Sequence, residues 1–416
     1  MPKMEVIGGE RLVGDVTASG AKNAVLPILA ACILLDGETN LTNAPYLGDV
    51  NIMLRMLSAL GMRAEHLTND EIHIRNDKKL RHIAPYDLVT AMRASFFVAG
   101  PLLAKTGFAK VPLPGGCSIG SRPVDIHLDG FKALGADVSI EHGFVQIKAK
   151  SLKGANIRLA FPSVGATENL MMAASLAKGE TVLTNVAKEP EIVDLAEFLI
   201  AAGAQIEGAG TGTIRIQGVQ SLNGLPSYSV IPDRIEVGTL MIAAAITAGE
   251  VTIHKTSYDH IASLAQLLLK MGVTVEQRDT SIFVSSTGEF LPVNFETEPY
   301  PGFPTDMQAQ MMSLLCVAKG KSRIKEAIFE NRFMHVSELI RMGAKIEIDN
   351  QYAFITGVPN LSGAEVRITD LRAGAALVLG GLVADGRSII HGLKHLRRGY
   401  HHLAEKLITL GANIIQ

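Results

Sequence analysis

The sequence lacks several features that would assign a protein to a class at once. Its longest apolar runs, Ala24–Leu35 and Ala373–Ala384, have 12 residues each, which is too few to span a bilayer as a helix. The start, Met1–Glu5, lacks the apolar run of a signal peptide. The formal net charge is −2, which gives no reason to expect nucleic acid or an anionic membrane as a partner. We therefore expect a cytoplasmic protein without membrane insertion.

Cysteines and recognisable metal or nucleotide motifs are also scarce. The three cysteines cannot all pair, and Cys32 and Cys316 lie in apolar helical patterns, where cysteine is usually a small core residue. We expect reduced thiols. The histidines, including His401 and His402, do not show the spacing of zinc sites, and no Walker or dinucleotide glycine motif is present. We therefore expect neither a metal nor a cofactor.

The sequence does contain a repeat of about 70 residues. A helix that ends in glycine and is followed by a short strand recurs six times, and these glycines lie 68 to 74 residues apart. Glycine just past a helix closes it, and similarity at a fixed period indicates a repeat architecture. A second glycine-terminated helix is expected between consecutive copies. The first series is Gly61, Gly135, Gly203, Gly272, Gly343 and Gly411, and the second is Gly37, Gly107, Gly179, Gly249, Gly320 and Gly386.

Each repeat has the pattern of a strand, an apolar helix, a strand, an amphipathic helix and a hairpin. In the second copy, Val138–Glu141 and Phe144–Lys148 alternate in polarity around His142-Gly143, as strands with one buried face do. The apolar helices, such as Leu240–Ala248, carry almost no charge, so we expect other elements to surround them. The sequence predicts an α/β fold: a two-domain inside-out α/β barrel of six repeats, three per domain, with helices inside and sheets outside.

The two ends of the chain indicate how the repeats divide into domains. The sixth repeat stops at Asn413–Gln416, after one hairpin strand, and residues 1–20 contain strands without a local partner. We expect residues 1–20 to complete the last repeat. The predicted lobes are 21–229, which carries the Cys117 loop, and 230–416 together with 1–20. With 225–232 as a linker, two crossing strands would allow the lobes to close over a cleft.

Cys117 lies in a loop that proline and glycine keep out of regular structure. A helix is expected to begin after it, with Ser121 as a cap and Pro123 in the first turn. A nearby arginine, Arg122, and a helix N-terminus both stabilise a thiolate. Two interpretations remain open from spacing alone: a reactive cysteine or an incidental loop thiol.

Polar residues gather where the apolar helices begin. Lysine and arginine repel the positive end of a helix, so an anionic ligand held by the cation and the exposed amides would explain them. The alternative is that each cluster is an ordinary solvated cap. Asp306 likewise is either a base for a hydroxyl or only an N-cap. The clusters are Lys22-Asn23, Arg93, Thr167-Glu168-Asn169, Asp233-Arg234 with Glu236, Asp306, and Asp370 with Arg372.

Nine short blocks carry a resemblance to a known family. In order along the chain they are Gly20–Asn23, Met92–Ser95, Leu113–Cys117, Gly120–Asp125, Pro162–Thr167, Pro301–Asp306, Phe329–Arg332, Asp370–Arg372 and Arg398–Tyr400. With these blocks the whole chain closely resembles the UDP-N-acetylglucosamine 1-carboxyvinyltransferases, which are enolpyruvyl transferases. The resemblance implies two inside-out α/β lobes of three units each. It also implies transfer of enolpyruvate from phosphoenolpyruvate to the 3′-hydroxyl of UDP-N-acetylglucosamine with release of phosphate.

The family's functional residues have counterparts at matching positions. The resemblance implies that Cys117 acts on phosphoenolpyruvate as a general acid and can form a covalent adduct. It implies that Asp306 accepts the proton of the sugar hydroxyl and that Lys22 is the third catalytic residue. The resemblance further implies the first committed step of peptidoglycan synthesis, with consequences for cell shape and division, and inhibition by fosfomycin. The other substrate-binding residues are Asn23, Arg93, Arg122, Pro123, Val124, Asp125, Ile126, Ser163, Val164, Gly165, Ile328, Arg332, Asp370, Arg372 and Arg398.

Two positions depart from the family pattern, and two other functions stay open. Arg397 stands where the family usually has aspartate, and Phe161 replaces a lysine of some members. The sister enolpyruvyl transferase of the shikimate pathway has the same repeat fold, although the cysteine loop and the Arg-Pro-Val-Asp block favour the UDP-sugar branch. A non-catalytic UDP-sugar-binding regulator is the second alternative, which the set Lys22, Cys117 and Asp306 disfavours.

Overall fold

The structure is a computed structural model that describes residues 3–77, 79–114 and 124–416. The described residues form two compact units. The N-terminal unit contains 20–114 and 124–231, and the C-terminal unit contains 3–19 and 232–416. Each unit has its own apolar core. Within the described residues, no helix has the length and hydropathy needed to cross a membrane.

The N-terminal unit is a mixed α/β structure with three sheets. Their strand orders are β13-β3-β5-β4, with β14 also on β3, then β6-β8-β7, and β11-β12-β10-β9. The strands are β3 (Leu35–Thr42), β4 (Arg63–His66), β5 (Ile72–Asn76), β6 (Phe108–Pro112), β7 (Asp137–Glu141), β8 (Phe144–Lys148), β9 (Asn156–Arg158), β10 (Glu180–Thr184), β11 (Gln205–Glu207), β12 (Thr213–Gln217), β13 (Leu222–Asn223) and β14 (Tyr228–Ser229). The helices are α1 (Lys22–Ala31), α2 (Gly48–Ala59), α3 (Tyr86–Ala91), the 3₁₀ helix η1 (Arg93–Val98), α4 (Ala99–Thr106), α5 (Asp125–Ala133), α6 (Val164–Ala174) and α7 (Pro190–Ala201).

The C-terminal unit has three larger sheets and the short pair β22-β24. The strand orders are β23-β25-β1-β26, β16-β17-β15-β2 and β18-β19-β21-β20. The strands are β1 (Lys3–Ile7), β2 (Val13–Thr17), β15 (Glu250–His254), β16 (Thr274–Arg278), β17 (Ser281–Ser285), β18 (Asn294–Glu296), β19 (Lys321–Lys325), β20 (Lys345–Asp349), β21 (Tyr352–Thr356), β22 (Leu361–Ser362), β23 (Glu365–Arg367), β24 (Ala384–Asp385), β25 (Arg387–His391) and β26 (Asn413–Ile415). The helices are α8 (Arg234–Ile246), η2 (Tyr258–Ile261), α9 (Ala262–Lys270), η3 (Thr305–Met307), α10 (Gln308–Leu315), α11 (Val336–Arg341), α12 (Leu371–Val383), α13 (Leu393–Leu396) and α14 (Leu403–Thr409).

The predicted hairpin of the second repeat is confirmed. Strands β7 and β8 pair antiparallel, with Asp137 opposite Lys148 and Glu141 opposite Phe144. His142 and Gly143 between them both have positive φ angles, 51° and 78°, as a two-residue turn that matches strand twist requires. The inward residues of β8 are buried, whereas the outward ones face solvent at least in part.

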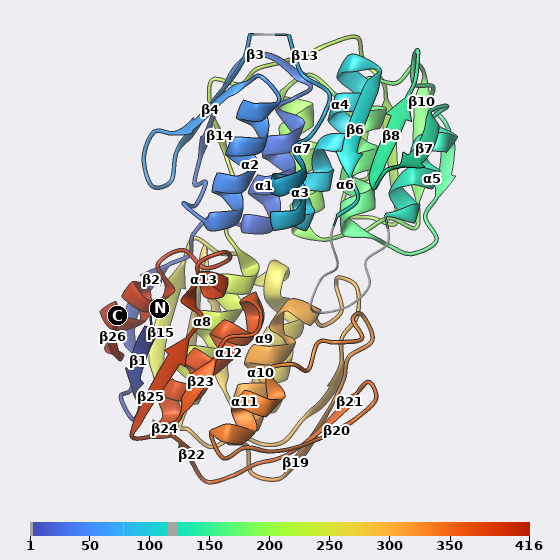
Figure 1. Cartoon of the computed structure of the whole chain (residues 1–416). Helices are drawn as coiled ribbons and strands as arrows, with labels where there is room; N and C mark the ends of the chain where they lie inside the picture. The colour runs from blue at the N-terminus through green and yellow to red at the C-terminus, as the bar shows by residue number, and fades with distance from the viewer. Residues whose placement is uncertain (1–2, 78, 115–123) are drawn as a thin grey trace. The chain divides into compact units, whose positions relative to one another are not determined.

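The predicted burial of the apolar helices is also confirmed. All residues of α8 are buried, and α8, α10 and α12 contact one another in the centre of the C-terminal unit (Figure 1). Each of these helices also packs on a different sheet: α8 on β15 and β17, α10 on β19 and β21, and α12 on β1 and β25. The described strands pair only within separate sheets and form no closed hydrogen-bonded barrel. The six-repeat inside-out barrel stays a prediction.

The N-terminal strands join two different sheets. Strand β1 lies between β25 and β26, and Val6 is opposite both Ser388 and Ile414. In Figure 1 this places the blue start of the chain beside its red end. Strand β2 instead pairs parallel with β15. The expectation that residues 1–20 complete the last repeat is therefore right for β1 and wrong for β2, because a short alternating strand does not specify its distant partner.

The two predicted glycine series have different outcomes. All six glycines of the first series have positive φ and follow a helix. In the second series Gly107 caps α4 directly, but α1 ends at Ala31 and Gly37 lies inside β3. Gly249 does not have positive φ. Gly37, Gly179, Gly320 and Gly386 also have positive φ, but none of them directly follows its helix.

The segment 225–232 is not a free linker. Tyr228 and Ser229 form β14, which pairs parallel with β3. Asn43 donates a side-chain hydrogen bond to the Val230 carbonyl over 2.7 Å. Sheet hydrogen bonds therefore hold this segment on the N-terminal unit up to Ile231.

Candidate functional site

The strongest polar cluster of the C-terminal unit is centred on Asp306 in η3. Its Oδ1 accepts a hydrogen bond from Arg332 Nη2 over 2.8 Å, and its Oδ2 accepts one from Arg372 Nη2 over 2.9 Å. Both arginine side chains are 4% exposed, whereas that of Asp306 is 29% exposed. Two buried guanidinium groups thus hold a carboxylate that still has access to solvent.

The start of α12 fixes Arg372. Asp370 is the N-cap, and its carboxylate accepts hydrogen bonds from the backbone N–H groups of Arg372 and Ala373. Burial alone would lower the pKa of Arg372, but Asp306, Tyr400 and Asp233 together more than offset this, and the pKa is raised. The guanidinium also lies 5.5 Å from the centre of the Tyr400 ring. Arg372 therefore stays charged in a buried position.

Asp306 is not a helix cap. The N-cap of η3 is Pro304 and that of α10 is Met307, and neither helix has a side-chain cap hydrogen bond. The N-cap alternative from the sequence is therefore wrong. The local sequence pattern alone suggested a cap, because it cannot show that the Asp306 carboxylate binds two arginines that lie 26 and 66 residues away in the chain.

A buried network fixes the backbone of Asp306. Gln310 Nε2 donates to the Asp306 carbonyl and to the Tyr400 hydroxyl, both over 2.9 Å. The Tyr400 hydroxyl in turn lies 2.9 Å from Thr239 Oγ1, which donates to the Ile235 carbonyl. The network joins α8 and α10 to the segment that carries Arg398, two residues before Tyr400.

In the N-terminal unit, the predicted cations lie where helices begin. Lys22 is the first residue of α1, and its Nζ is 3.5 Å from Asp49 Oδ2 in a largely buried pair. Asn23 is the second residue of α1, and Arg93 is the first residue of η1. Asp49 offsets the repulsion between Lys22 and the helix dipole.

The starts of α5 and α6 lie together in the same unit. Val124 is the N-cap of α5, and Ser163 is the N-cap of α6, where its side chain accepts from Ala166 N. An added Cβ at Gly165 would lie 3.4 Å from the imidazole of His127. The structure thus brings together two predicted groups, namely Val124, Asp125 and Ile126 on α5 and Ser163, Val164 and Gly165 on α6.

His127 occupies the contact between these helices. Its Nδ1 accepts a hydrogen bond from Asn169 Nδ2 over 3.2 Å, and its ring meets Phe96 edge to face at 5.3 Å. Burial, reinforced by the charge of Arg93, lowers the pKa of His127 to about 3. The imidazole is therefore neutral near pH 7.

Three of the predicted residues lie outside the described residues: Cys117, Arg122 and Pro123. The other two cysteines are buried as expected, and burial raises the pKa of both thiols. They are core residues. Because the N-terminal and C-terminal groups belong to different units, the predicted convergence on one cleft stays a prediction.

Comparison with known proteins identifies the family. The family described as EPSP synthase (3-phosphoshikimate 1-carboxyvinyltransferase) matches residues 6–407. The chain belongs to the EPSP synthase family. Among curated relatives, UDP-N-acetylglucosamine 1-carboxyvinyltransferase 1 of Caldanaerobacter subterraneus subsp. tengcongensis is 55% identical over 403 residues, covering 97% of this chain and 96% of the relative. UDP-N-acetylglucosamine 1-carboxyvinyltransferase 2 of Carboxydothermus hydrogenoformans is 52% identical over 416 residues, covering 100% and 99%.

Solved structures of two enolpyruvyl transferases have a similar fold. The enolpyruvyl transferase NikO from Streptomyces tendae is 28% identical and has a TM-score of 0.88, covering 99% of this chain and 98% of its own. EPSP synthase from Acinetobacter baumannii has a TM-score of 0.78 at 20% identity, covering all of both chains. At this identity the second likeness shows the fold alone.

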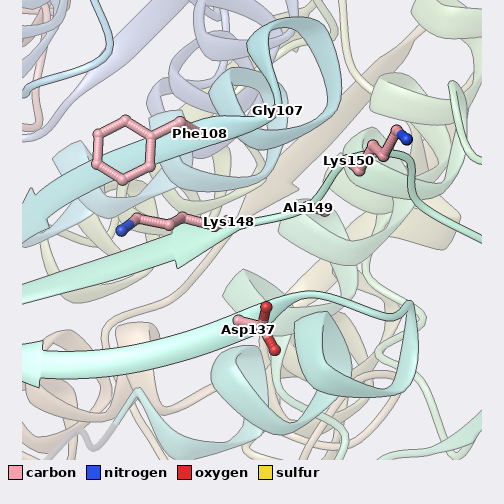
Figure 2. Close-up of a pocket in the computed structure, with 6 residues that line it drawn as sticks. All are labelled: Gly107, Phe108, Asp137, Lys148, Ala149 and Lys150. Atoms are coloured by element: carbon pink, nitrogen blue, oxygen red, sulfur yellow. The ribbon is translucent and has the colours of Figure 1, made fainter.

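A surface hollow of the N-terminal unit contains none of the predicted site residues. It measures about 450 Å³ and lies beside β6, β7 and β8 (Figure 2). Lys148 Nζ lies 5.5 Å from the centre of the Phe108 ring, a cation–π arrangement. The lining residues are Gly107, Phe108, Asp137, Lys148, Ala149 and Lys150.

Sequence reasoning missed several polar residues of these clusters. Asp49 pairs with Lys22, His127 lies against Gly165, and Glu326 accepts a hydrogen bond from Thr305, the residue before Asp306. A usable signal existed only for His127, which follows Asp125 by two residues, and for Tyr400, which ends a family block. Asp49 and Glu326 are distant from the site residues in the sequence and contact them only in the folded chain.

Proposed function

We propose that the chain transfers the enolpyruvyl group of phosphoenolpyruvate to the 3′-hydroxyl of UDP-N-acetylglucosamine and releases phosphate, the first committed step of peptidoglycan synthesis. The observation that carries this proposal is identity of 52–55% over essentially the whole chain to relatives named UDP-N-acetylglucosamine 1-carboxyvinyltransferase. The cluster of Asp306, Arg332 and Arg372 supports it, because the chemistry needs a base among cations.

In this proposal Asp306 is the general base. The guanidinium groups of Arg332 and Arg372 favour its ionised form, which is the form that accepts a proton. Its partial exposure leaves room for a hydroxyl to approach. The sugar oxygen then bonds to C2 of phosphoenolpyruvate as its proton passes to Asp306.

Cys117 supplies the matching proton to C3 of phosphoenolpyruvate, so that the addition gives a tetrahedral intermediate. Loss of a proton from C3 then breaks the bond between C2 and the phosphate oxygen, and phosphate leaves. Phosphoenolpyruvate is a trianion, so it needs several cations, and donors fixed in advance stabilise the charges of the intermediate. We assign phosphate and carboxylate binding to Lys22, Arg122 and Arg398, with further positive charge from Arg93 and Arg372.

The starts of α5 and α6 are proposed to seat the uridine diphosphate. Gly165 of α6 lies beside His127 of α5, and Ser163 is the N-cap of α6. Exposed amides at helix starts favour phosphate groups. Asn23, Asp370 and Ile328 are proposed to contact the sugar nucleotide as well.

The proposal also covers the domain organisation, the cellular location and the inhibition of the protein. We propose two inside-out lobes of three repeats each, in which the discontinuous domain expected as 1–20 and 230–416 corresponds to the C-terminal unit, 3–19 and 232–416. The pairing of β1 with β25 and β26 supports the discontinuity. We also propose a cytoplasmic enzyme that is inhibited by fosfomycin at Cys117 and contributes to cell shape and division.

A single assay tests the function against its alternatives. Purified protein is given phosphoenolpyruvate with either UDP-N-acetylglucosamine or shikimate 3-phosphate, and phosphate release is followed. We expect release with the UDP-sugar only. Release with shikimate 3-phosphate would assign the chain to the sister branch, and release with neither would favour a non-catalytic binding protein.

A further inference from the structure

A second buried carboxylate, that of Glu326, lies directly after β19 and is 3% exposed. Its Oε1 accepts hydrogen bonds from Thr297 Oγ1 (2.9 Å), Ile328 N (3.0 Å) and Phe329 N (3.2 Å). Thr305 Oγ1 lies 3.1 Å from Oε1 and 3.0 Å from Oε2. A carboxylate is costly to bury without donors. Four donors from three segments satisfy this one.

Two of these segments carry the residues of the Asp306 cluster. Thr305 immediately precedes Asp306 in η3. Ile328 and Phe329 begin the segment that leads to Arg332, whose guanidinium binds Asp306. Glu326 therefore joins the backbone of the carboxylate to the backbone of its arginine partner.

We propose that Glu326 is a positioning residue for the reaction, acting through Thr305 on Asp306 and through the amides of Ile328 and Phe329 on Arg332. The inference rests on the proposed function, in which Asp306 is the base. A general base must stay within hydrogen-bond reach of its proton, and a displacement of about 1 Å can cost on the order of 100-fold in rate. The third segment, at Thr297, adjoins neither residue along the chain, and its hydroxyl also accepts a hydrogen bond from Ala327 N over 2.9 Å.

The two threonines provide a matched test. Thr305→Val removes the hydroxyl next to Asp306, whereas Thr297→Val removes a hydroxyl that binds the same carboxylate and Ala327 N but does not adjoin Asp306 in the chain. We expect Thr305→Val to lower kcat for phosphate release about 10- to 100-fold with a smaller change in KM. Thr297→Val should keep kcat within about threefold of the wild type, although it loses a comparable amount of thermal stability. Thr305→Ser, which retains the hydroxyl, should restore kcat.

A double variant separates action through Glu326 from direct contact between Thr305 and substrate. If both residues act as one unit, Thr305→Val combined with Glu326→Gln costs no more in kcat than the larger single change. The proposal would be overturned if the kcat losses of the two single changes multiplied in the double variant. Equal kcat losses for Thr305→Val and Thr297→Val, or a normal kcat in Thr305→Val, would also overturn it.

Hydrogen exchange tests the same proposal without turnover. In Glu326→Gln, peptides covering 304–308 and 327–332 should exchange faster than in the wild type, while peptides of α1 and α6 serve as unchanged controls. If the wild type releases no phosphate, the proposed function fails, and this measurement still decides the role of Glu326. Unchanged exchange in both peptides overturns it.

Discussion

The two units hold their polar residues in different ways. In the C-terminal unit, the carboxylate of Asp306 binds two buried arginines within 2.9 Å. In the N-terminal unit, Lys22 Nζ and Asp49 Oδ2 are 3.5 Å apart. Glu168, which is fully buried in α6, has no hydrogen-bond partner for either carboxylate oxygen among the described residues.

Asp306 is thus a carboxylate paired with cations, whereas Glu168 is a carboxylate buried near other acids. Burial, together with the charges of Glu191 and Glu189, raises the pKa of Glu168 well above its ordinary value. In the folded chain Glu168 therefore keeps its proton at pH values at which an exposed glutamate is ionised. Asp306, in contrast, lies between two positive charges. We infer that the C-terminal unit is electrostatically organised for proton transfer by its own residues.

The largest expected effect is that of Asp306→Asn. Asparagine keeps the shape and can still contact one arginine, but it cannot accept the proton. Turnover should fall by about 10² to 10⁴, measured as phosphate release, while calorimetry still detects binding of UDP-N-acetylglucosamine. Asp385→Asn, at an exposed position of the same unit, is the control. Near-normal turnover of Asp306→Asn would move the search for the base to Asp370.

Arg372→Met tests the matched charges through stability. Removal of one partner of a buried ion pair should reduce the free energy of unfolding by about 3 kcal/mol, measured by urea denaturation. The control is Arg387→Met, because Arg387 is 60% exposed and binds Glu5 at the surface, where such pairs contribute about 0–1 kcal/mol. Equal losses for the two variants would contradict the importance of burial here.

His335→Gln tests the C-terminal unit through the pH dependence of its stability. Burial lowers the pKa of His335 to about 4, with Asp370 opposing and Arg332 reinforcing the change. The unfolded chain therefore takes up a proton near pH 6.5, which the folded chain takes up only near pH 4, so stability is lost as the pH falls through this window. Between pH 7 and pH 5 the wild type should lose about 2 kcal/mol more than the variant in urea unfolding.

Glu168→Gln, in the N-terminal unit, should change the pH dependence of stability in the direction opposite to that of His335→Gln. The folded chain keeps a proton on Glu168 that the unfolded chain releases above about pH 4.5, so this group reduces stability as the pH rises. The stability of Glu168→Gln relative to that of the wild type should therefore increase as the pH rises, measured by urea unfolding. A parallel pH dependence of the His335 and Glu168 variants would refute the contrast between the units.

The smallest effect is expected at the surface hollow of Figure 2. Lys148→Ala removes a cation–π contact with Phe108, worth about 0.5–1 kcal/mol at an exposed site. Turnover should not change, because the hollow contains none of the proposed site residues. A large loss of phosphate release would show that the hollow belongs to the site.

Local features of the fold followed from the sequence, whereas distant pairings did not. The β7–β8 hairpin could be predicted because alternation and its two-residue turn are both local. The burial of the later turns of α8, Leu240–Ile246, followed from their lack of charge. The partner of β2 did not, since β15 lies more than 230 residues away and any half-buried edge would suit a five-residue strand.

The same limit applies to the site. Lys22, Asp306 and Arg372 could be named as candidates because each stands near the start of an apolar helix. The salt bridges of Asp306 and the four donors of Glu326 could not, because they connect separate segments through tertiary packing. Glu326 also follows a strand of ordinary polarity, so nothing in its neighbourhood in the sequence distinguishes it.

The central place of β1 in its sheet has a consequence for synthesis of the chain. Its two neighbours, β25 and β26, are translated roughly 380 to 410 residues later, which at about 5–20 residues per second corresponds to roughly 20–80 s. The N-terminal unit contains all its strands once residue 231 has emerged. During that interval both edges of β1 stay unpaired and are open to wrong partners. Nascent chains arrested before residue 387 should therefore be bound by chaperones at their first ten residues, even when the N-terminal unit is already folded.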